Sequence, residues 1–136
     1  MNHRIRVLIA DDQPRARRSL KALLTTLPQI EQVIEAVNGS EGMRFIEESQ
    51  PDLAIFDVRM PEMDGLEATR LVRARWPEIK IIILSMNEDQ ASDALAAGAD
   101  AFFSKGEPPQ RLLDALVALT VPMHDRLQVG PTAQGV

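Results

Sequence analysis

Short apolar runs alternate along the chain with stretches in which apolar residues recur every three or four positions. An apolar run bounded by turn or polar residues is typical of a buried strand. Nearly continuous apolar runs favour a parallel sheet, because both faces of such a sheet are covered. The pattern predicts five strands, at residues 5–10, 33–37, 53–56, 79–84 and 101–104.

The stretches between these strands predict five helices. The first begins at Gln13-Pro14, because proline is tolerated in a first turn. Its inward stripe comprises Ala16, Leu20, Leu23, Leu24 and Leu27. The second follows the turn Asn38-Gly39 and has Ser40 as its predicted N-cap. Its inward residues are Met43, Phe45 and Ile46.

The remaining three helices carry clear stop or start signals. The third covers residues 66–75 and is ended by Trp76-Pro77, with predicted core contacts from Leu66, Leu71 and Val72. The fourth is alanine-rich, covers residues 89–97 and is closed by Gly98, a usual C-cap residue. The last begins at Pro108 or Pro109, with mostly inward positions at Leu112, Leu113, Leu116, Val117 and Leu119.

Five strands alternating with five helices predict βαβ units, which give an α/β fold with a parallel sheet and helices on both faces. A chain of 136 residues suggests one domain. From Pro122 onward the periodicity disappears. We therefore expect a domain over residues 1–121, and a flexible tail or the start of a linker over residues 122–136.

Composition narrows the classes of function. The net charge of −5 argues against direct nucleic-acid binding by this domain, which would need a basic face. There is no cysteine, so thiolate chemistry and zinc–thiolate sites are excluded. No apolar run approaches the roughly 20 residues of a membrane helix, and the N-terminus lacks a signal-peptide pattern. We expect a cytoplasmic protein that does not bind membranes.

Polar groups stand where four of the predicted strands end. They are Asp11-Asp12, Asp57, Ser85 and Lys105. The ends of parallel strands lie along one edge of the sheet, where open α/β sheets bind their ligands. Three carboxylates in one place raise each other's pKa unless a cation lies among them. Oxygen ligands of this kind suit a hard ion such as Mg²⁺ (or Mn²⁺).

The same residues indicate phosphoryl chemistry. An aspartate can act as a nucleophile and form an acyl phosphate. The ammonium of Lys105 and the hydroxyl of Ser85 could meet phosphoryl oxygens. Taken singly, each residue also has an ordinary structural interpretation: Asp11 or Asp12 as a helix cap, the others as turn and loop residues. The convergence of all of them on one sheet edge favours a functional site.

Four segments resemble the receiver domains of two-component response regulators. The resemblance covers roughly residues 4–121, and its segments are residues 7–12, 57–65, 83–86 and 98–105. It implies a flavodoxin-like three-layer sandwich with strand order 2-1-3-4-5. The sequence Asp57-Val58-Arg59-Met60-Pro61 is similar to the corresponding motif of receivers with helix-turn-helix DNA-binding outputs.

The resemblance also implies roles for individual residues. Asp57 would be the phosphoacceptor. Asp11, Asp12, Asp57 and the backbone carbonyl of Arg59 would hold the metal ion. The residues that contact the phosphoryl group and carry the switch would be Ser85, Lys105 and Phe102.

Three positions depart from the pattern of many relatives. Met86 is larger than the usual residue beside the site. Phe102 lacks the hydroxyl of tyrosine at the switch position. Gly106 stands where many relatives have a proline, so no cis-proline can follow Lys105.

The predicted function is a phosphoacceptor switch rather than an enzyme. It would take a phosphoryl group from a sensor histidine kinase or a phosphotransfer protein and control an output such as transcription. A homodimer is a further partner that it could form. One alternative is a magnesium-dependent phosphohydrolase with an aspartyl nucleophile, but Arg59 stands where such enzymes carry a second Asp. Another is a binding module that does not use phosphate.

A basic cluster in the first helix has two interpretations. It comprises Arg15, Arg17, Arg18 and Lys21. A solvated helix face is the simpler one. A contact surface for the kinase is the other, because this helix begins beside Asp11 and Asp12.

Overall fold

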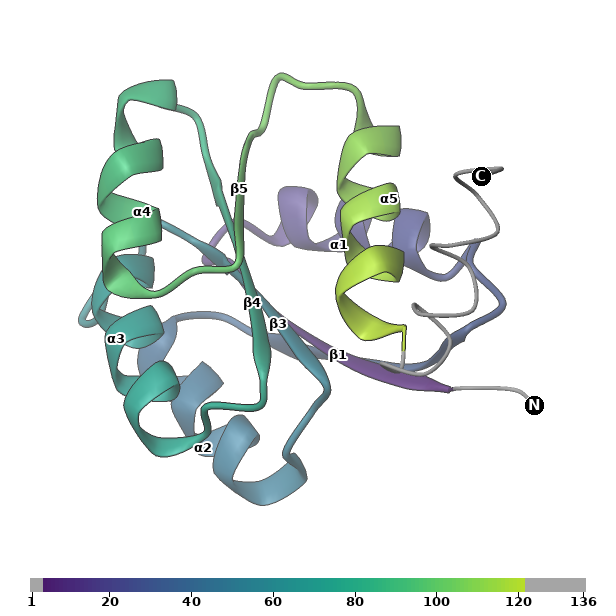
Figure 1. Ribbon diagram of the computed structural model, residues 1–136, viewed down its shortest axis with the longest axis horizontal. Coiled ribbons are helices and arrows are strands. Elements are labelled where there is room, and N and C mark those ends of the chain that lie inside the picture. The colour runs from purple at the N-terminus through teal and green to yellow at the C-terminus, as the bar shows by residue number, and fades with distance from the viewer. Residues whose placement is uncertain (1–3, 122–136) are drawn as a thin grey trace, which may run out of the picture.

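The computed structural model describes residues 4–121, so the predicted tail over residues 122–136 lies outside the described residues. Its elements run along the chain in the expected alternation (Figure 1). They are β1 (Ile5–Ala10), α1 (Pro14–Leu24), β2 (Ile30–Ala36), α2 (Gly39–Ser49), β3 (Leu53–Asp57), α3 (Gly65–Arg75), β4 (Lys80–Ser85), the 3₁₀ turn η1 (Glu88–Gln90), α4 (Ala91–Ala97), β5 (Ala101–Ser104) and α5 (Pro109–Thr120).

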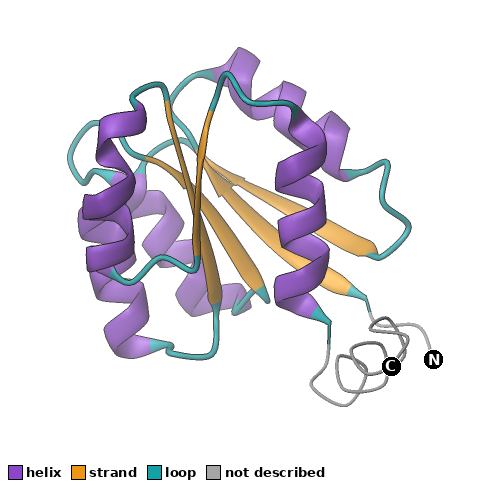
Figure 2. Ribbon diagram, turned by 45° about the horizontal axis from the view of Figure 1, so that its top comes forward, coloured by secondary structure: helices purple, strands orange, loops and turns teal. Residues whose placement is uncertain are grey.

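The sheet has five parallel strands in the order β2-β1-β3-β4-β5, as predicted. Helices cover both of its faces, which makes three layers (Figure 2). Helices α1 and α5 pack on one face, where they bury Leu24 and Leu116 with strand residues such as Ile9. Helices α2, α3 and α4 cover the other face. Alternate residues of each strand point to opposite faces of the sheet and pack into the two hydrophobic cores. Both sets must therefore be apolar, which is why the strand segments are apolar throughout.

Four sequence-based expectations about these elements were wrong in detail. Asn38, not Ser40, caps α2, because its side chain accepts a hydrogen bond from the Glu41 backbone at 2.8 Å. Leu71 is exposed rather than in the core, since the buried stripe of α3 runs through Ala68 and Val72. Strand β2 begins at Ile30, before the apolar residues that predicted it. The fourth helix begins at Ala91, after a separate 3₁₀ turn.

The loop after β3 turns back sharply onto its own strand. The Gly65 backbone N–H donates to the carbonyl of Val58 at 2.8 Å. A Cβ atom at Gly65 would collide with the carbonyl oxygen of Asp57, so only glycine fits here. The Asp64 side chain then caps α3 by accepting from the Glu67 backbone at 2.8 Å. This loop fixes the position of the strand end that carries Asp57.

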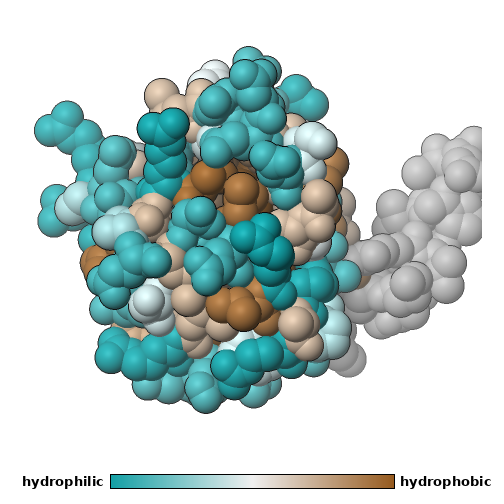
Figure 3. Space-filling model, turned by 90° about the vertical axis from the view of Figure 1, so that its left-hand side faces the viewer, coloured by the Kyte–Doolittle hydropathy of each residue, from teal (hydrophilic) through white to brown (hydrophobic). Residues whose placement is uncertain are grey.

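The surface over α3 and α4 is mainly hydrophilic, with separate small apolar patches (Figure 3). Among residues 4–121, the exposed large hydrophobic side chains are Val37, Leu71, Met86 and Leu95. None of the helices described is long and apolar enough to cross a bilayer.

Candidate functional site

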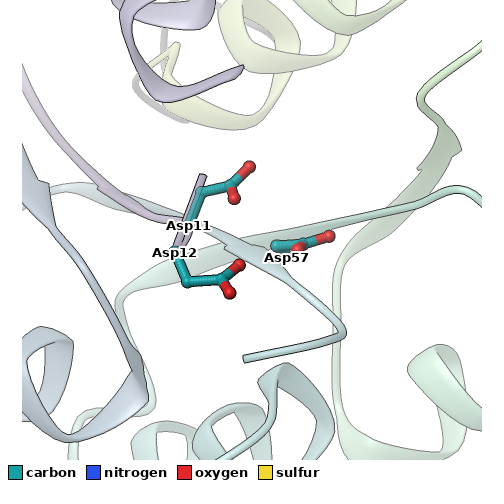
Figure 4. A group of neighbouring side chains, drawn as sticks. All are labelled: Asp11, Asp12 and Asp57. Carbon is teal, nitrogen blue, oxygen red and sulfur yellow. The ribbon is translucent and has the colours of Figure 1, made fainter. Parts of the chain in front are cut away.

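Three carboxylates lie side by side at the carboxyl end of the sheet (Figure 4). Asp11 and Asp12 follow β1 directly, and Asp57 is the last residue of β3. These two strands are hydrogen-bonded neighbours, which brings residues 46 positions apart together. One oxygen from each carboxylate lies within 4.8 Å of the other two. Asp11 and Asp57 are buried, whereas Asp12 is exposed.

Lys105 joins two of these carboxylates. Its Nζ atom lies 3.0 Å from Asp11 Oδ2 and 3.2 Å from Asp57 Oδ1. The backbone N–H of Lys105 donates to the carbonyl of Ser85 at 2.8 Å, which extends the β4–β5 register into the site. The sequence predicted that Lys105 lies at this edge of the sheet, and the structure shows that it forms ion pairs with both Asp11 and Asp57.

The loop after Lys105 is closed without a proline. Glu107 accepts a hydrogen bond from the Ser104 backbone at 2.9 Å through Oε2, and its own N–H donates to the Ser104 carbonyl at 3.0 Å. No cis peptide bond occurs in residues 4–121, in line with Gly106 after the lysine. A carboxylate thus braces the turn that presents Lys105.

The site shifts the pKa of both charged partners. Burial raises the pKa of Asp57 above its usual value, and the charge of Asp11 adds to this, although Lys105 opposes it. Burial alone would lower the pKa of Lys105, but the hydrogen bond to Asp11 and the charge of Asp57 outweigh burial and raise it. The lysine therefore stays cationic beside carboxylates that repel one another.

Ser85 is the last residue of β4, and its side chain is buried. Its hydroxyl oxygen accepts a hydrogen bond from the Asn87 backbone at 3.0 Å. The hydroxyl donates to Gln90 Oε1 at 2.5 Å. Sequence reasoning missed Gln90, because a polar residue at the start of a surface helix carries no signal of its own.

A cavity of about 360 Å³ opens over these groups. Met86 stands at this cavity with 79% of its surface exposed, so it borders the site without filling it. Phe102 is half-buried and packs against the core on the α3–α4 side, beside Ile83 in the strand register. The cavity is lined by Asp12, Gln13, Asp57, Arg59, Ser85, Met86, Asn87 and Lys105.

The three carboxylates fit a small hard cation. Mg²⁺ keeps its oxygen ligands at about 2.1 Å, so opposite ligands stand roughly 4.2 Å apart. The 4.8 Å within which the three oxygens gather is close to that span. An exposed carboxylate, Asp12, at the rim also leaves an open side for entry of the ion.

The family model of the response regulator receiver domain matches residues 7–117. The chain belongs to this family. The resemblance on which the sequence prediction rested is therefore confirmed. As a class, receiver domains are signalling phosphoacceptors of two-component systems and are mostly non-enzymatic, and they interact with histidine kinases or phosphotransfer proteins.

Solved receiver structures share the fold of this receiver domain. A two-component response regulator of the LuxR family from Aurantimonas sp. SI85-9A1 superposes with a TM-score of 0.81 at 30% identity, covering 86% of this chain and 85% of that one. The response regulator TrrA from Thermotoga maritima, in complex with Mg(2+)-BeF, gives a TM-score of 0.78 at 30% identity, covering 85% and 98%.

Curated relatives of the receiver domain are longer proteins. The uncharacterized transcriptional regulatory protein YhcZ of Bacillus subtilis (strain 168) is 40% identical over 111 residues, which are 80% of this chain and 52% of YhcZ. A protein-glutamate methylesterase/protein-glutamine glutaminase of Nocardioides sp. is 34% identical, over 97% of this chain and 39% of that protein. The chain thus spans about half, or less, of the length of these relatives.

Proposed function

We propose that Asp57 accepts a phosphoryl group and that the domain, residues 1–121, works as a phosphorylation switch. The observation that supports this is the placement of the Asp57 carboxylate in an open cavity, 3.2 Å from the ammonium of Lys105 and beside two further carboxylates. A nucleophile, a fixed cation and a cation-binding acidic pair are the parts that phosphoryl transfer to a carboxylate needs.

In the proposed step, a carboxylate oxygen of Asp57 attacks the phosphorus of the donor. An O–P bond forms as the N–P bond of a phosphohistidine, or the O–P bond of acetyl phosphate, breaks, and the leaving atom keeps the electron pair. The ammonium of Lys105 forms an ion pair with one phosphoryl oxygen, and the Ser85 hydroxyl donates a hydrogen bond to another. Later attack by water would release inorganic phosphate and restore the carboxylate.

The residues that would hold Mg²⁺ (or Mn²⁺) are Asp11, Asp12 and Asp57, together with the backbone carbonyl of Arg59, a residue that lines the same cavity. When bound, such an ion offsets the charge of the carboxylates and of the phosphoryl oxygens. The chain supplies the remaining positive charge through Lys105.

We propose that Ser85 and Phe102 transmit the conformational change caused by phosphorylation of Asp57 to the surface of the domain. Movement of the Ser85 hydroxyl toward the phosphoryl group would free space on the α3–α4 side, into which Phe102 can turn. The surface around α4, β5 and α5 would change as a result. Because YhcZ is named a transcriptional regulatory protein, control of transcription is the output that we propose.

The donor side of the reaction would lie over α1. A cavity of about 460 Å³ between α1 and α5 begins at Lys105 and Asp11 and has mostly apolar walls. Arg17 and Lys21 pair with Glu35 at 3.1 and 3.3 Å; Arg17 is half-buried, whereas Lys21 is exposed. Arg15 and Arg18 remain exposed. We propose that a helical histidine kinase or phosphotransfer partner docks here, in the cytoplasm, where kinases draw on ATP.

Charge reversal separates this docking from the chemistry. Arg18→Glu should slow phosphorylation by phosphorylated histidine kinases of the source organism, while phosphorylation by acetyl phosphate stays unchanged. Equal slowing with both donors would contradict the docking surface, because only the chemistry is shared by the two reactions.

The deciding experiment is intact-mass measurement after incubation with acetyl phosphate and Mg²⁺. We expect one added phosphoryl group, which hydroxylamine removes. The Asp57→Asn variant and a sample treated with a chelator should gain none. An adduct that persists in Asp57→Asn would overturn the assignment, and rapid turnover of a small phosphate ester would point to a phosphohydrolase instead.

A further inference from the structure

The Ser85 hydroxyl makes two hydrogen bonds within the chain. It has a single proton, and that proton is directed at Gln90 Oε1 over 2.5 Å. The other side of the oxygen accepts the Asn87 backbone N–H at 3.0 Å. Both contacts lie beside the cavity that contains Asp57.

Two acceptors therefore compete for one proton. The oxygens of a phosphoryl group at neutral pH act as acceptors, so they can bond to Ser85 only if the hydroxyl donates to them. A serine hydroxyl that donates to Gln90 cannot donate to the phosphoryl group at the same time. The bond from Asn87 uses a lone pair of the Ser85 oxygen and does not compete for the proton.

The position of Gln90 allows its side chain to release the Ser85 hydroxyl. It ends the 3₁₀ turn η1 and stands at the N-cap of α4, but its side chain does not cap that helix. It also lines a second hollow, of about 430 Å³, together with Asp12, Arg59 and Asp64. The released amide thus has open space next to the site.

We propose that Gln90 is a positioning residue that holds the Ser85 hydroxyl away from the phosphoryl group and so acts as a latch on the switch. The inference rests on the proposed phosphoacceptor function. Binding of a phosphoryl group requires the unlatched form, so the apparent affinity is reduced by the fraction of molecules in which the latch is open. Because Gln90 is the N-cap residue of α4, release of the latch frees that end of the helix.

The test is a titration of the full chain with beryllofluoride in the presence of Mg²⁺. Isothermal calorimetry measures the binding affinity. Gln90→Met keeps the length of the side chain but replaces the amide oxygen by a much weaker acceptor. It should bind beryllofluoride about 2- to 10-fold more tightly than the wild type, which is the effect of one neutral hydrogen bond. Gln90→Glu keeps an acceptor oxygen and should bind no more tightly than the wild type.

Two controls separate a latch from general loosening. Gln110→Met removes a side-chain hydrogen bond to Asp114 at 2.8 Å on the surface of α5 and should leave the affinity unchanged. In a Ser85→Ala background there is no proton to hold, so Gln90→Met should have no effect there. Equal gains in both backgrounds would show a structural effect and overturn the latch.

The outcomes distinguish the two proposals. If the wild type binds beryllofluoride and Gln90→Met binds it with the same affinity, the latch is wrong and the phosphoacceptor function stands. If neither protein binds it while both remain folded by thermal unfolding, the phosphoacceptor function fails, and the latch fails with it.

Discussion

The two ends of α4 are held in different ways. Its C-terminal end, at Gly98, is fixed by Arg73 of α3, whose Nε donates to the Gly98 carbonyl at 3.0 Å. Its N-terminal end, at Gln90, is tied to the sheet through the Ser85 hydroxyl. The first contact belongs to a charged network, whereas the second is a neutral hydrogen bond made by a residue of the site.

The charged network reaches several elements at once. Arg73 also donates to the carbonyls of Pro77 and Ile79 at 2.8 and 3.0 Å and to Asp100 Oδ2 at 2.6 Å. Asp100 Oδ2 in turn accepts from the Ile81 backbone at 2.8 Å. One guanidinium thus joins α3, the segment before β4 and the turn after α4. We call Arg73 with these partners (Pro77, Ile79, Gly98 and Asp100) the Arg73 clamp.

This difference indicates which end of the helix can move. Between its ends α4 has only seven residues, and its buried residues are the small Ala94 and Ala97. Few apolar contacts resist displacement of such a helix. We expect α4 to turn about the Arg73 clamp when the latch at Gln90 opens, so that a signal from the site appears at its N-terminal end.

The largest expected effect is loss of the clamp. Arg73→Ala should lower the free energy of unfolding by about 2–4 kcal/mol, because four hydrogen bonds from a charged donor are lost. Urea unfolding measures this. Arg70→Ala, at an exposed position of the same helix, should stay within about 0.5 kcal/mol of the wild type. Similar losses in both variants would contradict a specific clamp.

Gly98 offers the next largest effect. Its φ of 111° is unfavourable for other residues, and a Cβ atom would lie 3.1 Å from Arg73 Cγ. Gly98→Ala should therefore destabilise the domain by about 1–2 kcal/mol. The matched control is Gly106→Ala, whose Cβ would meet nothing closer than Ser104 Oγ at 3.8 Å. Equal thermal shifts in the two variants would count against a strained C-cap.

A smaller effect is expected from the acidic partner of the clamp. Asp100→Asn keeps an oxygen that can accept from Ile81 and Arg73 but removes the negative charge. We expect a loss of about 0.5–1.5 kcal/mol in urea unfolding. Glu78→Gln removes one negative charge at a nearby exposed position and should change stability very little. A larger loss from Glu78→Gln would show that net charge matters more than this contact.

The smallest expected effect is local and concerns the latch. In Gln90→Met, the backbone amide of residue 90, which donates to the Asn87 carbonyl at 3.2 Å, should exchange with deuterium about 2- to 10-fold faster. The Ala99 amide, which donates to Ala94 at 3.1 Å beyond the clamp, should keep its rate. Faster exchange at both ends would show that α4 loosens as a whole.

The sequence predicted the site better than it predicted the contacts that control it. Asp11, Asp57 and Lys105 could be placed together because parallel strands end on one edge of the sheet. Gln90 and Arg73 could not be found in this way. Both are polar residues on helices near the surface, and their partners are chosen by the packing of segments that lie apart in sequence.

Errors at the level of single helices have a similar origin. Asn38 and Ser40 are both good capping residues, so local propensity did not decide between them. Leu71 fits an apolar stripe on α3, but the buried face of the helix runs through Ala68 and Val72, which leaves this position exposed. Arg17 looked like part of a solvated face, yet Glu35 on β2 and the carbonyl of Asp11 hold it.

The sequence by itself determined the alternation of strands and helices, the family and the set of acidic and basic groups at the sheet edge. These follow from periodicity and from residue types, which act locally. The tertiary structure alone decided which polar partners meet: Ser85 with Gln90 at the movable end of α4, and Arg73 with Gly98 and Asp100 at the fixed end. Hydrogen bonds depend on distances of a few tenths of an ångström, and only the packing of the whole domain sets these.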